Sequence, residues 1–266
     1  MPSITQPFSV VDWRTRFQQQ ARWTRSLRQY LLPRAGLQKS LRLLEVGCGP
    51  GAILDEIKQQ VSGAETEFPL SNNLQFHGLD IRHDYLAYYA SQNPAAPLIQ
   101  GDAHSLPYRS GAFDLVICHF LLLWVNDPTR VLEEMRRVCR QGGSVLALAE
   151  PDYGGRIDYP AALARLGGLQ TEAIRKQGAD PETGRKLGWM FSQAGLSDIE
   201  VGVLGGQWRT ELSENEWDLE WQVLRQDLGD ILSEAAWRAV EEDGRQANQS
   251  GSRILYVPTF YAWGRK

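Results

Sequence analysis

The sequence predicts an α/β fold: a doubly wound, mostly parallel sheet with helices on both faces, plus additional helical segments. Short apolar runs alternate with amphipathic helical periods through roughly the first half of the chain, as in a doubly wound sheet. The first apolar run leads directly into a cluster of glycines that opens a helix. A chain of 266 residues, 42% hydrophobic and 23% charged, can form one large α/β domain with insertions.

Seven apolar stretches are expected to form strands: residues 41–46, 74–79, 97–100, 113–118, 144–150, 199–204 and 254–263. The helix before the fifth strand is well marked. Asp127 suits its N-cap and Pro128 its first helical position, and Gly142 and Gly143 are expected to end it. Its apolar face contains Val131, Leu132, Met135, Val138 and Cys139.

Three further segments are expected to be helical. Residues before Arg34 predict one helix broken by Pro33, with an inward face of Phe17, Thr24, Leu27 and Leu31. Residues 151–190 are rich in glycine, proline and arginine, with a helix over 161–176, and residues 211–249 predict acidic helices with three tryptophans. We therefore expect an N-terminal helical cap over 1–36 and a main domain over 37–266, with cap insertions near 151–190 and 211–249. Plain packing is the alternative role for these segments.

The glycine loop after the first strand is the most informative segment. It reads Glu45-Val46-Gly47-Cys48-Gly49-Pro50-Gly51. The helix that follows has Ile53, Leu54, Ile57 and Val61 on one face. Glycines at alternate positions let the backbone turn tightly and approach a ligand, because no Cβ intrudes. Since a helix N-terminus also offers free N–H groups there, the segment predicts a nucleotide-type cofactor loop, with a ligand-free glycine turn as the alternative.

The same loop fits the dinucleotide pattern loosely, because Gly47-x-Gly49-x-x-Ala52 satisfies G-x-G-x-x-G/A. Three details argue against NAD. Glu45 at the strand exit would repel a pyrophosphate, and Pro50 removes a backbone donor. The next acid that ends a strand, Asp80, follows Gly47 at a longer spacing than the dinucleotide fold uses. A cofactor with a cationic group and no phosphate suits Glu45 better.

This loop resembles the first motif, E-x-G-x-G-x-G, of the class I S-adenosylmethionine (SAM)-dependent methyltransferases. The resemblance implies a Rossmann-like seven-stranded, mostly parallel sheet with helices on both faces, in which the last two strands pair antiparallel. It also implies SAM as the cofactor, bound by Glu45, Gly47, Cys48, Gly49 and Gly51. In this family, extra segments usually cover the cofactor and build the substrate pocket.

Asp80 ends the second expected strand. A carboxylate there can accept hydrogen bonds from both ribose hydroxyls. An N-cap for the helix that starts near Asp84 is the alternative. The resemblance places the next residue, Ile81, against the adenine face, although a lone isoleucine could equally be a core residue.

The third motif is D-A-x-x-L-P-(aromatic), from Asp102 to Tyr108, followed by F-D-L-V. It is similar to the branch related to the ubiquinone and menaquinone biosynthesis methyltransferases. That match implies that Asp102 accepts a hydrogen bond from the adenine amino group and that the amide of Ala103 donates to the ring. A turn-forming aspartate is the alternative.

The fourth strand runs into His119, which by family analogy contacts the methionine part of SAM. His119 as a general base is a further hypothesis; a lone histidine is more often simply hydrogen-bonded. No catalytic residue is assigned. Trp124 stands where a histidine is common in this branch, and it either packs or shapes the acceptor pocket. Other expected pocket residues are Tyr153, Arg156, Arg185, Trp189 and Trp221.

Several sites and partners are not expected. The N/D-P-P-Y tetrapeptide of adenine and amide N-methyltransferases is missing. Glu150 and Asp152 resemble half of a metal site, but we expect no metal. The net charge of −4 gives no basic footprint for nucleic acid. Cys48, Cys118 and Cys139 have neither metal-ligand spacing nor the even number of a disulfide framework.

The sequence thus predicts a cytoplasmic enzyme that transfers a methyl group from SAM to a small-molecule acceptor. It shows no apolar stretch of membrane length and no basic-then-apolar secretory signal. Whether oxygen, nitrogen, carbon or sulfur is methylated is open, as is the oligomeric state, with a homodimer as one option. The rival functions are an NAD-dependent oxidoreductase and a non-catalytic SAM-binding or partner-binding protein on the same fold.

Overall fold

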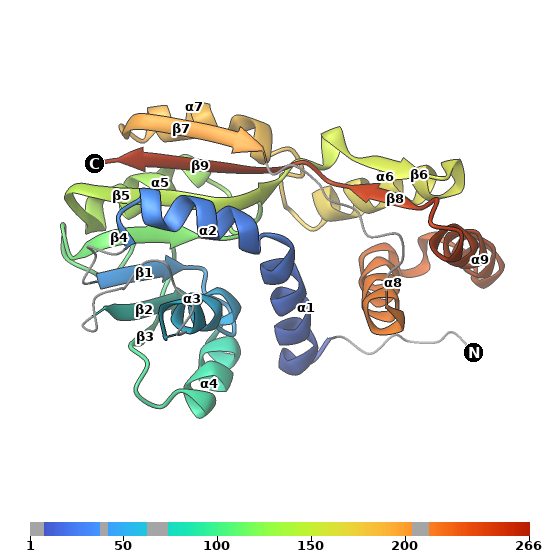
Figure 1. Ribbon diagram of the computed structural model, residues 1–266, viewed down its shortest axis with the longest axis horizontal. Helices are drawn as coiled ribbons and strands as arrows, with labels where there is room; N and C mark the ends of the chain where they lie inside the picture. Colours follow the sequence, from blue (N-terminus) through green and yellow to red (C-terminus); the bar gives the residue numbers. More distant parts are fainter. Residues whose placement is uncertain (1–7, 38–41, 63–73, 204–212) are drawn as a thin grey trace. The chain divides into compact units, whose positions relative to one another are not determined.

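The computed structural model describes residues 8–37, 42–62, 74–203 and 213–266 (Figure 1). The chain divides into two compact units. We call Phe8–Glu150, Thr183–Leu204 and Thr259–Lys266 the sheet unit, and Met1–Pro7, Pro151–Glu182 and Gly205–Pro258 the helical unit. The helical unit therefore interrupts the sheet unit twice along the chain, at residues 151–182 and 205–258.

The sheet unit contains seven strands in the order β3-β2-β1-β4-β5-β9-β7 (Figure 1). They are β1 (Arg42–Val46), β2 (Gln75–Asp80), β3 (Leu98–Gln100), β4 (Phe113–Cys118), β5 (Cys139–Pro151), β7 (Ser197–Val203) and β9 (Thr259–Arg265). From β3 through β2, β1 and β4 to β5, each strand pairs in parallel with the next, whereas β7 and β9 pair antiparallel. The predicted fold class and the antiparallel last pair are therefore confirmed. Leu41 and Leu204 of the predicted strands lie outside the described residues.

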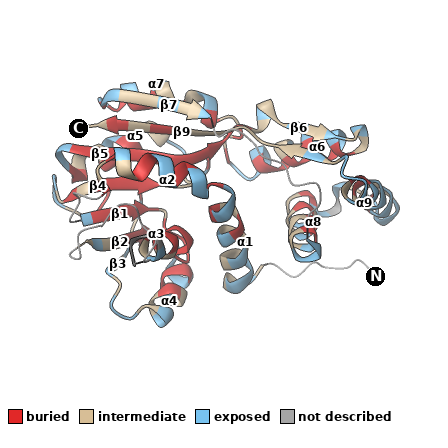
Figure 2. Ribbon diagram, in the orientation of Figure 1, coloured by how far each residue is buried: buried red, intermediate tan, exposed pale blue. Residues whose placement is uncertain are grey.

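Both faces of this sheet are covered, as the continuous apolar runs require. Alternate residues of β1 and β4 enter two separate cores: Leu44 and Val116 face one, and Leu43 and Leu115 face the other. Helices α5 (Pro128–Val138) and α7 (Leu187–Gln193) close the first core. Helices α2 (Arg25–Arg34), α3 (Ala52–Ser62) and α4 (His83–Gln92) close the second. Figure 2 shows the buried residues concentrated along the central strands.

The N-terminal segment differs from the single helix predicted. It forms α1 (Val10–Trp23) and α2, and the break falls at Thr24 instead of Pro33. Thr24 leaves helical geometry, and its hydroxyl lies 3.1 Å from the carbonyl oxygen of Gln20. Such a side chain competes with the helix for backbone groups. Pro33 stays within the last turn of α2, where its missing N–H costs only one hydrogen bond.

The predicted strand over 254–263 is two strands. Ile254–Tyr256 forms β8, which pairs antiparallel with β6 (Ile157–Tyr159) in the helical unit. Pro258 precedes β9 and has no N–H to give to a sheet ladder. Helix α5, which precedes β5, also ends earlier than predicted, at Val138. Cys139 already has extended geometry and begins β5.

The helical unit has a core of its own. Helices α6 (Ala161–Lys176), α8 (Glu214–Leu228) and α9 (Glu234–Gln249) meet around three buried indoles. The ring centroids of Trp217 and Trp221 lie 5.2 Å apart, and those of Trp221 and Trp237 lie 6.2 Å apart. Trp221 is thus a core residue and not a wall of an open pocket, contrary to the sequence prediction. Within the described ranges, no helix is long and apolar enough to cross a membrane.

The N-cap of α5 gives a direct test of the crossover. The Asp127 carboxylate accepts a hydrogen bond from the N–H of Arg130 (2.9 Å). Asp127→Ala should lower the free energy of unfolding in urea by about 1 kcal/mol, because this N–H loses its partner. Asp127→Ser should retain most of the stability, since serine also caps. Equal stability of the parent and the alanine variant would contradict the capping role.

Candidate cofactor site

The carboxyl ends of four strands bring the predicted motifs to one edge of the sheet. Val46 at the end of β1 lies beside Leu79 of β2 and Cys118 of β4, and Asp80 lies beside Gln100 of β3. In open α/β sheets, ligands bind outside these strand ends. The three predicted motifs and the exit of β4 therefore share one location within the sheet unit.

The glycine loop has the backbone that its sequence predicted. Gly47, Gly49 and Gly51 all have positive φ, at 73°, 52° and 80°. Side chains other than glycine rarely adopt this conformation. A Cβ on Gly49 would also lie 3.2 Å from the ring of Phe17 in α1. The first N-terminal helix thus packs over the loop.

Asp80 links the loop to the second strand. Its Oδ2 accepts a hydrogen bond from the N–H of Gly49 (2.7 Å), and its Oδ1 accepts one from the N–H of Arg82 (2.8 Å). Burial raises the pKa of Asp80, and these two backbone donors oppose the rise. The N-cap residue of α4 is Arg82, so the N-cap alternative for Asp80 is wrong. Ile81 is 65% exposed, which excludes the core alternative for that residue.

Glu45 is buried, with 2% of its surface exposed, behind the loop. Burial raises its pKa well above the usual range, while the Arg28 charge and a backbone hydrogen bond from Leu54 oppose the rise. Its Oε2 has no hydrogen-bond partner within the described part of the chain. A buried carboxylate oxygen without a partner is unfavourable unless a ligand group pairs with it.

Arg28 joins the N-terminal helices to α3, and sequence reasoning missed it. The side chain is fully buried, forms an ion pair with Glu56, donates to the carbonyl of Ala21, and donates to Thr24 Oγ1 (2.5 Å). Burial lowers its pKa, and Glu56 opposes that effect. A signal was present, because Arg28 follows Thr24 by four residues and therefore shares its predicted inward face.

His119 contacts the same network. Its Nε2 lies 2.9 Å from Thr24 Oγ1. Burial, and then the positive charge of Arg28, hold the pKa of His119 well below its usual range. The ring is therefore neutral at pH 7 and a weak base, which disfavours the general-base hypothesis. Contact with the methionine part of SAM stays a prediction.

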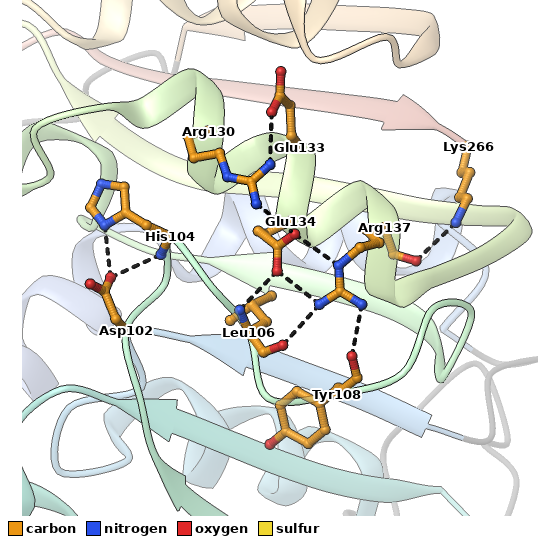
Figure 3. A network of polar contacts seen from close by, with 9 residues as sticks. All are labelled: Asp102, His104, Leu106, Tyr108, Arg130, Glu133, Glu134, Arg137 and Lys266. Atoms are coloured by element: carbon orange, nitrogen blue, oxygen red, sulfur yellow. Dashed lines mark hydrogen bonds and ion pairs between the residues drawn. The ribbon is translucent and has the colours of Figure 1, made fainter.

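Asp102 and His104 form a pair at the end of β3 (Figure 3). Asp102 Oδ1 accepts from the backbone N–H of His104 (2.9 Å) and lies 2.7 Å from its Nδ1. The turn-forming role that was the alternative for Asp102 is thus present. The side chain is also 57% exposed, so it stays accessible to a ligand. Ala103 is buried against the core beside Leu106.

An Arg–Glu pair on α5 fixes the loop after Asp102 (Figure 3). Glu134 accepts from the N–H of Leu106 (2.9 Å) and pairs with Arg137 (2.8 Å). Arg137 in turn donates to the carbonyls of Leu106 and Tyr108, both at 2.8 Å. Planar guanidinium groups suit such forked bonding. Sequence reasoning missed this anchor, because from the sequence Glu134 and Arg137 form only an i,i+3 charge pair on a helix.

Glu150 is a structural carboxylate. Its oxygens accept from the N–H groups of Leu121 (2.9 Å), Leu122 (3.0 Å) and Leu123 (3.3 Å) at the start of the short 3₁₀ helix Leu122–Trp124. Burial raises its pKa to about 7, against these three donors. No cluster of metal-ligating residues occurs among the residues that the structure describes. Trp124 itself is 49% exposed, so core packing does not explain it.

The comparisons with known proteins agree with this geometry. Residues 44–147 match the family described as a methyltransferase domain. The phosphatidylethanolamine N-methyltransferase of Cereibacter sphaeroides is 35% identical over 153 residues, which are 53% of this chain and 68% of that protein. The chain belongs to the SAM-dependent methyltransferases. The predicted family is thereby confirmed.

Other methyltransferases match over longer stretches. The demethylmenaquinone methyltransferase of Geobacillus kaustophilus is 29% identical over 203 residues, 70% of this chain and 81% of that protein. The structure of Haemonchus contortus phosphoethanolamine N-methyltransferase 2 with SAM has a TM-score of 0.54 at 17% identity, over 91% of this chain and 52% of that one. This likeness shows the shared fold. The chain spans between 38% and 68% of the first three curated relatives it matches.

SAM is the methyl donor of this family, and the site of this methyltransferase fits it. The unpartnered Glu45 Oε2 suits a cationic ammonium group. The three loop glycines have positive φ, so the chain turns tightly at the strand ends without a Cβ.

Gly49→Val should abolish SAM binding. The branched side chain disfavours the positive φ and meets Phe17, so the loop cannot keep its path. Calorimetric titration with S-adenosylhomocysteine measures the loss. Gly178→Val is the matched control, because Gly178 also has a positive φ, 91°, but belongs to the helical unit and not to the loop. Wild-type affinity in Gly49→Val would show that the loop is not the cofactor cradle.

Glu150 should make stability depend on pH. Its folded-state pKa of about 7 lies above the usual 4.5, so the folded protein keeps a proton that the unfolded chain releases between these values. The stability that Glu150 contributes should fall as pH rises through this window and stay constant above it. The advantage of the parent over Glu150→Gln in urea should therefore be larger at about pH 5 than at about pH 8. Glu133→Gln, at an exposed helix position, serves as control. An advantage independent of pH would contradict the assignment.

Proposed function

We propose that this methyltransferase binds SAM at the carboxyl edge of β1 to β4 and methylates a small-molecule acceptor. The observation that carries the proposal is the meeting of the positive-φ glycine loop with Asp80, within 2.7 Å of Gly49 N. Relatives named for phosphatidylethanolamine and demethylmenaquinone support a small-molecule acceptor. The net charge of −4 also argues against a polyanion.

The adenosine part would lie over β2 and β3. Asp80, at the end of β2, would accept from the ribose hydroxyls with the lone pairs that Gly49 and Arg82 leave open. The exposed side chain of Ile81 would cover the adenine face. Asp102 would accept from the adenine amino group, with the amide of Ala103 donating to the ring.

The methionine part would lie over β1 and β4. Glu45 would pair with the ammonium group through its unpartnered Oε2. His119 would contact the same part from the end of β4. The loop residues would contribute backbone groups and close approach: Gly47, Cys48, Gly49 and Gly51.

In methyl transfer, the protein would act mainly by positioning the acceptor and less by removing a proton from it. When bound, SAM supplies an electrophilic methyl group on a sulfonium. The chain would hold the acceptor in line with it, and proximity and orientation alone can supply much of the acceleration. His119, with its lowered pKa, is a poor proton acceptor, so we assign no base.

We also propose that the N-terminal helices and the helical unit act as caps. Within the helical unit, Tyr153, Arg156 and Asp158 line a groove of about 370 Å³, which would take part in acceptor recognition. Arg156 already forms a two-pronged ion pair with Asp158 (2.7 and 2.9 Å) and contacts Gln170. Its charge is therefore neutralised within the unit, which favours an acceptor without a free anionic group here. The proposed enzyme is a cytoplasmic protein.

The function is tested with methyl-labelled SAM and a protein-free metabolite extract. Label should move into small molecules with the parent and not with Gly49→Val, and mass spectrometry of the labelled fraction identifies the acceptor. Tight SAM binding without transfer to small molecules would favour the alternative, a non-catalytic SAM-binding or partner-binding protein.

Asp80→Ala should weaken SAM binding about tenfold or more, because charge-assisted hydrogen bonds to the ribose and the Gly49 anchor disappear together. Calorimetry gives the dissociation constant, and circular dichroism checks the fold. Asp84→Ala is the matched control, since Asp84 is an exposed carboxylate that pairs with Arg82 at the surface. An unchanged dissociation constant in a folded Asp80→Ala would remove Asp80 from the site.

A further inference from the structure

The tautomer of His104 follows from its two partners. Its Nε2 lies 3.4 Å from the backbone nitrogen of Asp127, whose N–H can only donate. Nε2 therefore accepts, and the ring proton is on Nδ1. That proton is donated to Asp102 Oδ1 at 2.7 Å. The imidazole thus connects the end of β3 to the start of α5.

This contact fixes the orientation of the Asp102 carboxylate. Oδ1 accepts both the Nδ1–H and the backbone N–H of His104, whereas Oδ2 has no hydrogen-bond partner within the described ranges. The two bonds from His104 also hold the pKa of Asp102 below its usual value, the backbone bond contributing most. An exposed aspartate without such contacts would sample several rotamers. Here one oxygen is occupied and the other is kept available.

We propose that His104 is a positioning residue that aims Asp102 Oδ2 at the exocyclic amino group of adenine and so sets the base specificity of the site. The inference rests on the proposed SAM site. A fixed carboxylate oxygen accepts from a 6-amino group but meets the oxygen of a 6-oxo base unfavourably. The pair should therefore discriminate adenine from hypoxanthine on the same ribosyl-homocysteine frame.

The loop does not depend on His104 for its fold, which makes the proposal testable. Leu106 and Tyr108 are anchored separately by Glu134 and Arg137 (Figure 3). Removing the imidazole should thus leave the Asp102 carboxylate with only the backbone bond from residue 104, so that it turns more freely, and should leave the loop in place. His83, an exposed histidine at the start of α4, provides a matched control.

The experiment is calorimetric titration with S-adenosylhomocysteine and with its deaminated form, S-inosylhomocysteine. The parent and His83→Ala should prefer the adenine form by about tenfold or more. His104→Ala should lose most of that preference by weaker binding of the adenine form alone. His104→Asn, whose amide N–H can donate to Oδ1, should recover part of it.

Asp102→Asn gives a sharper readout. His104 needs an acceptor, so the amide oxygen should face it and the NH₂ should take the place of Oδ2. The preference should then invert towards the 6-oxo base, and His104→Ala in the same background should weaken the inversion. The inversion in Asp102→Asn alone decides the matter if His104→Ala does not fold.

The outcomes separate the two proposals. If the parent binds neither compound, the proposed SAM site is wrong. If the parent prefers the adenine form and His104→Ala keeps the full preference, or if Asp102→Asn shows no inversion, the positioning role of His104 is overturned.

Discussion

The site depends on how the chain leaves β1 and passes over the end of β2. The N–H groups of Gly47 and Cys48 both donate to the carbonyl of Leu79, at 2.8 and 2.9 Å. Gly49 then donates to the Asp80 carboxylate. These bonds satisfy the N–H groups of Gly47, Cys48 and Gly49 at the strand ends, and the positive φ angles of the glycines follow from that path.

Near this loop, the buried charge of Arg28 interacts with groups on several elements. Arg28 joins α2 to α3 through Glu56, lowers the pKa of His119, and partly offsets the buried charge of Glu45. Removing one member of such a network leaves another charge unpaired in a dry environment, which costs several times more than an exposed pair is worth. The N-terminal helices are therefore tied electrostatically to the cofactor edge as well as by apolar packing.

Sequence reasoning recovered the features that depend on local pattern. The glycine loop, the strand end at Asp80 and the N-cap at Asp127 could be predicted because glycine and aspartate are favoured at such positions for local chemical reasons. It failed where a long-range partner decides the outcome. Thr24 breaks the N-terminal helix and contacts His119. Glu150 resembles a metal ligand in the sequence, but three backbone N–H groups bind its carboxylate. Trp221 was a candidate pocket residue, but it packs in a core with two other indoles. Such pairings join residues far apart in the chain, so periodicity carries no trace of them.

The position of β9 has a consequence for synthesis on the ribosome. Residues 259–265 insert between β5 and β7, although both of those strands are made much earlier. Until β9 emerges, β5 presents an unpaired edge along an apolar strand, the kind of surface that recruits other chains. The sheet unit therefore cannot complete its sheet during translation of its first two segments. While residues 205–258 are being synthesised, the edge of β5 stays unpaired unless a chaperone shields it.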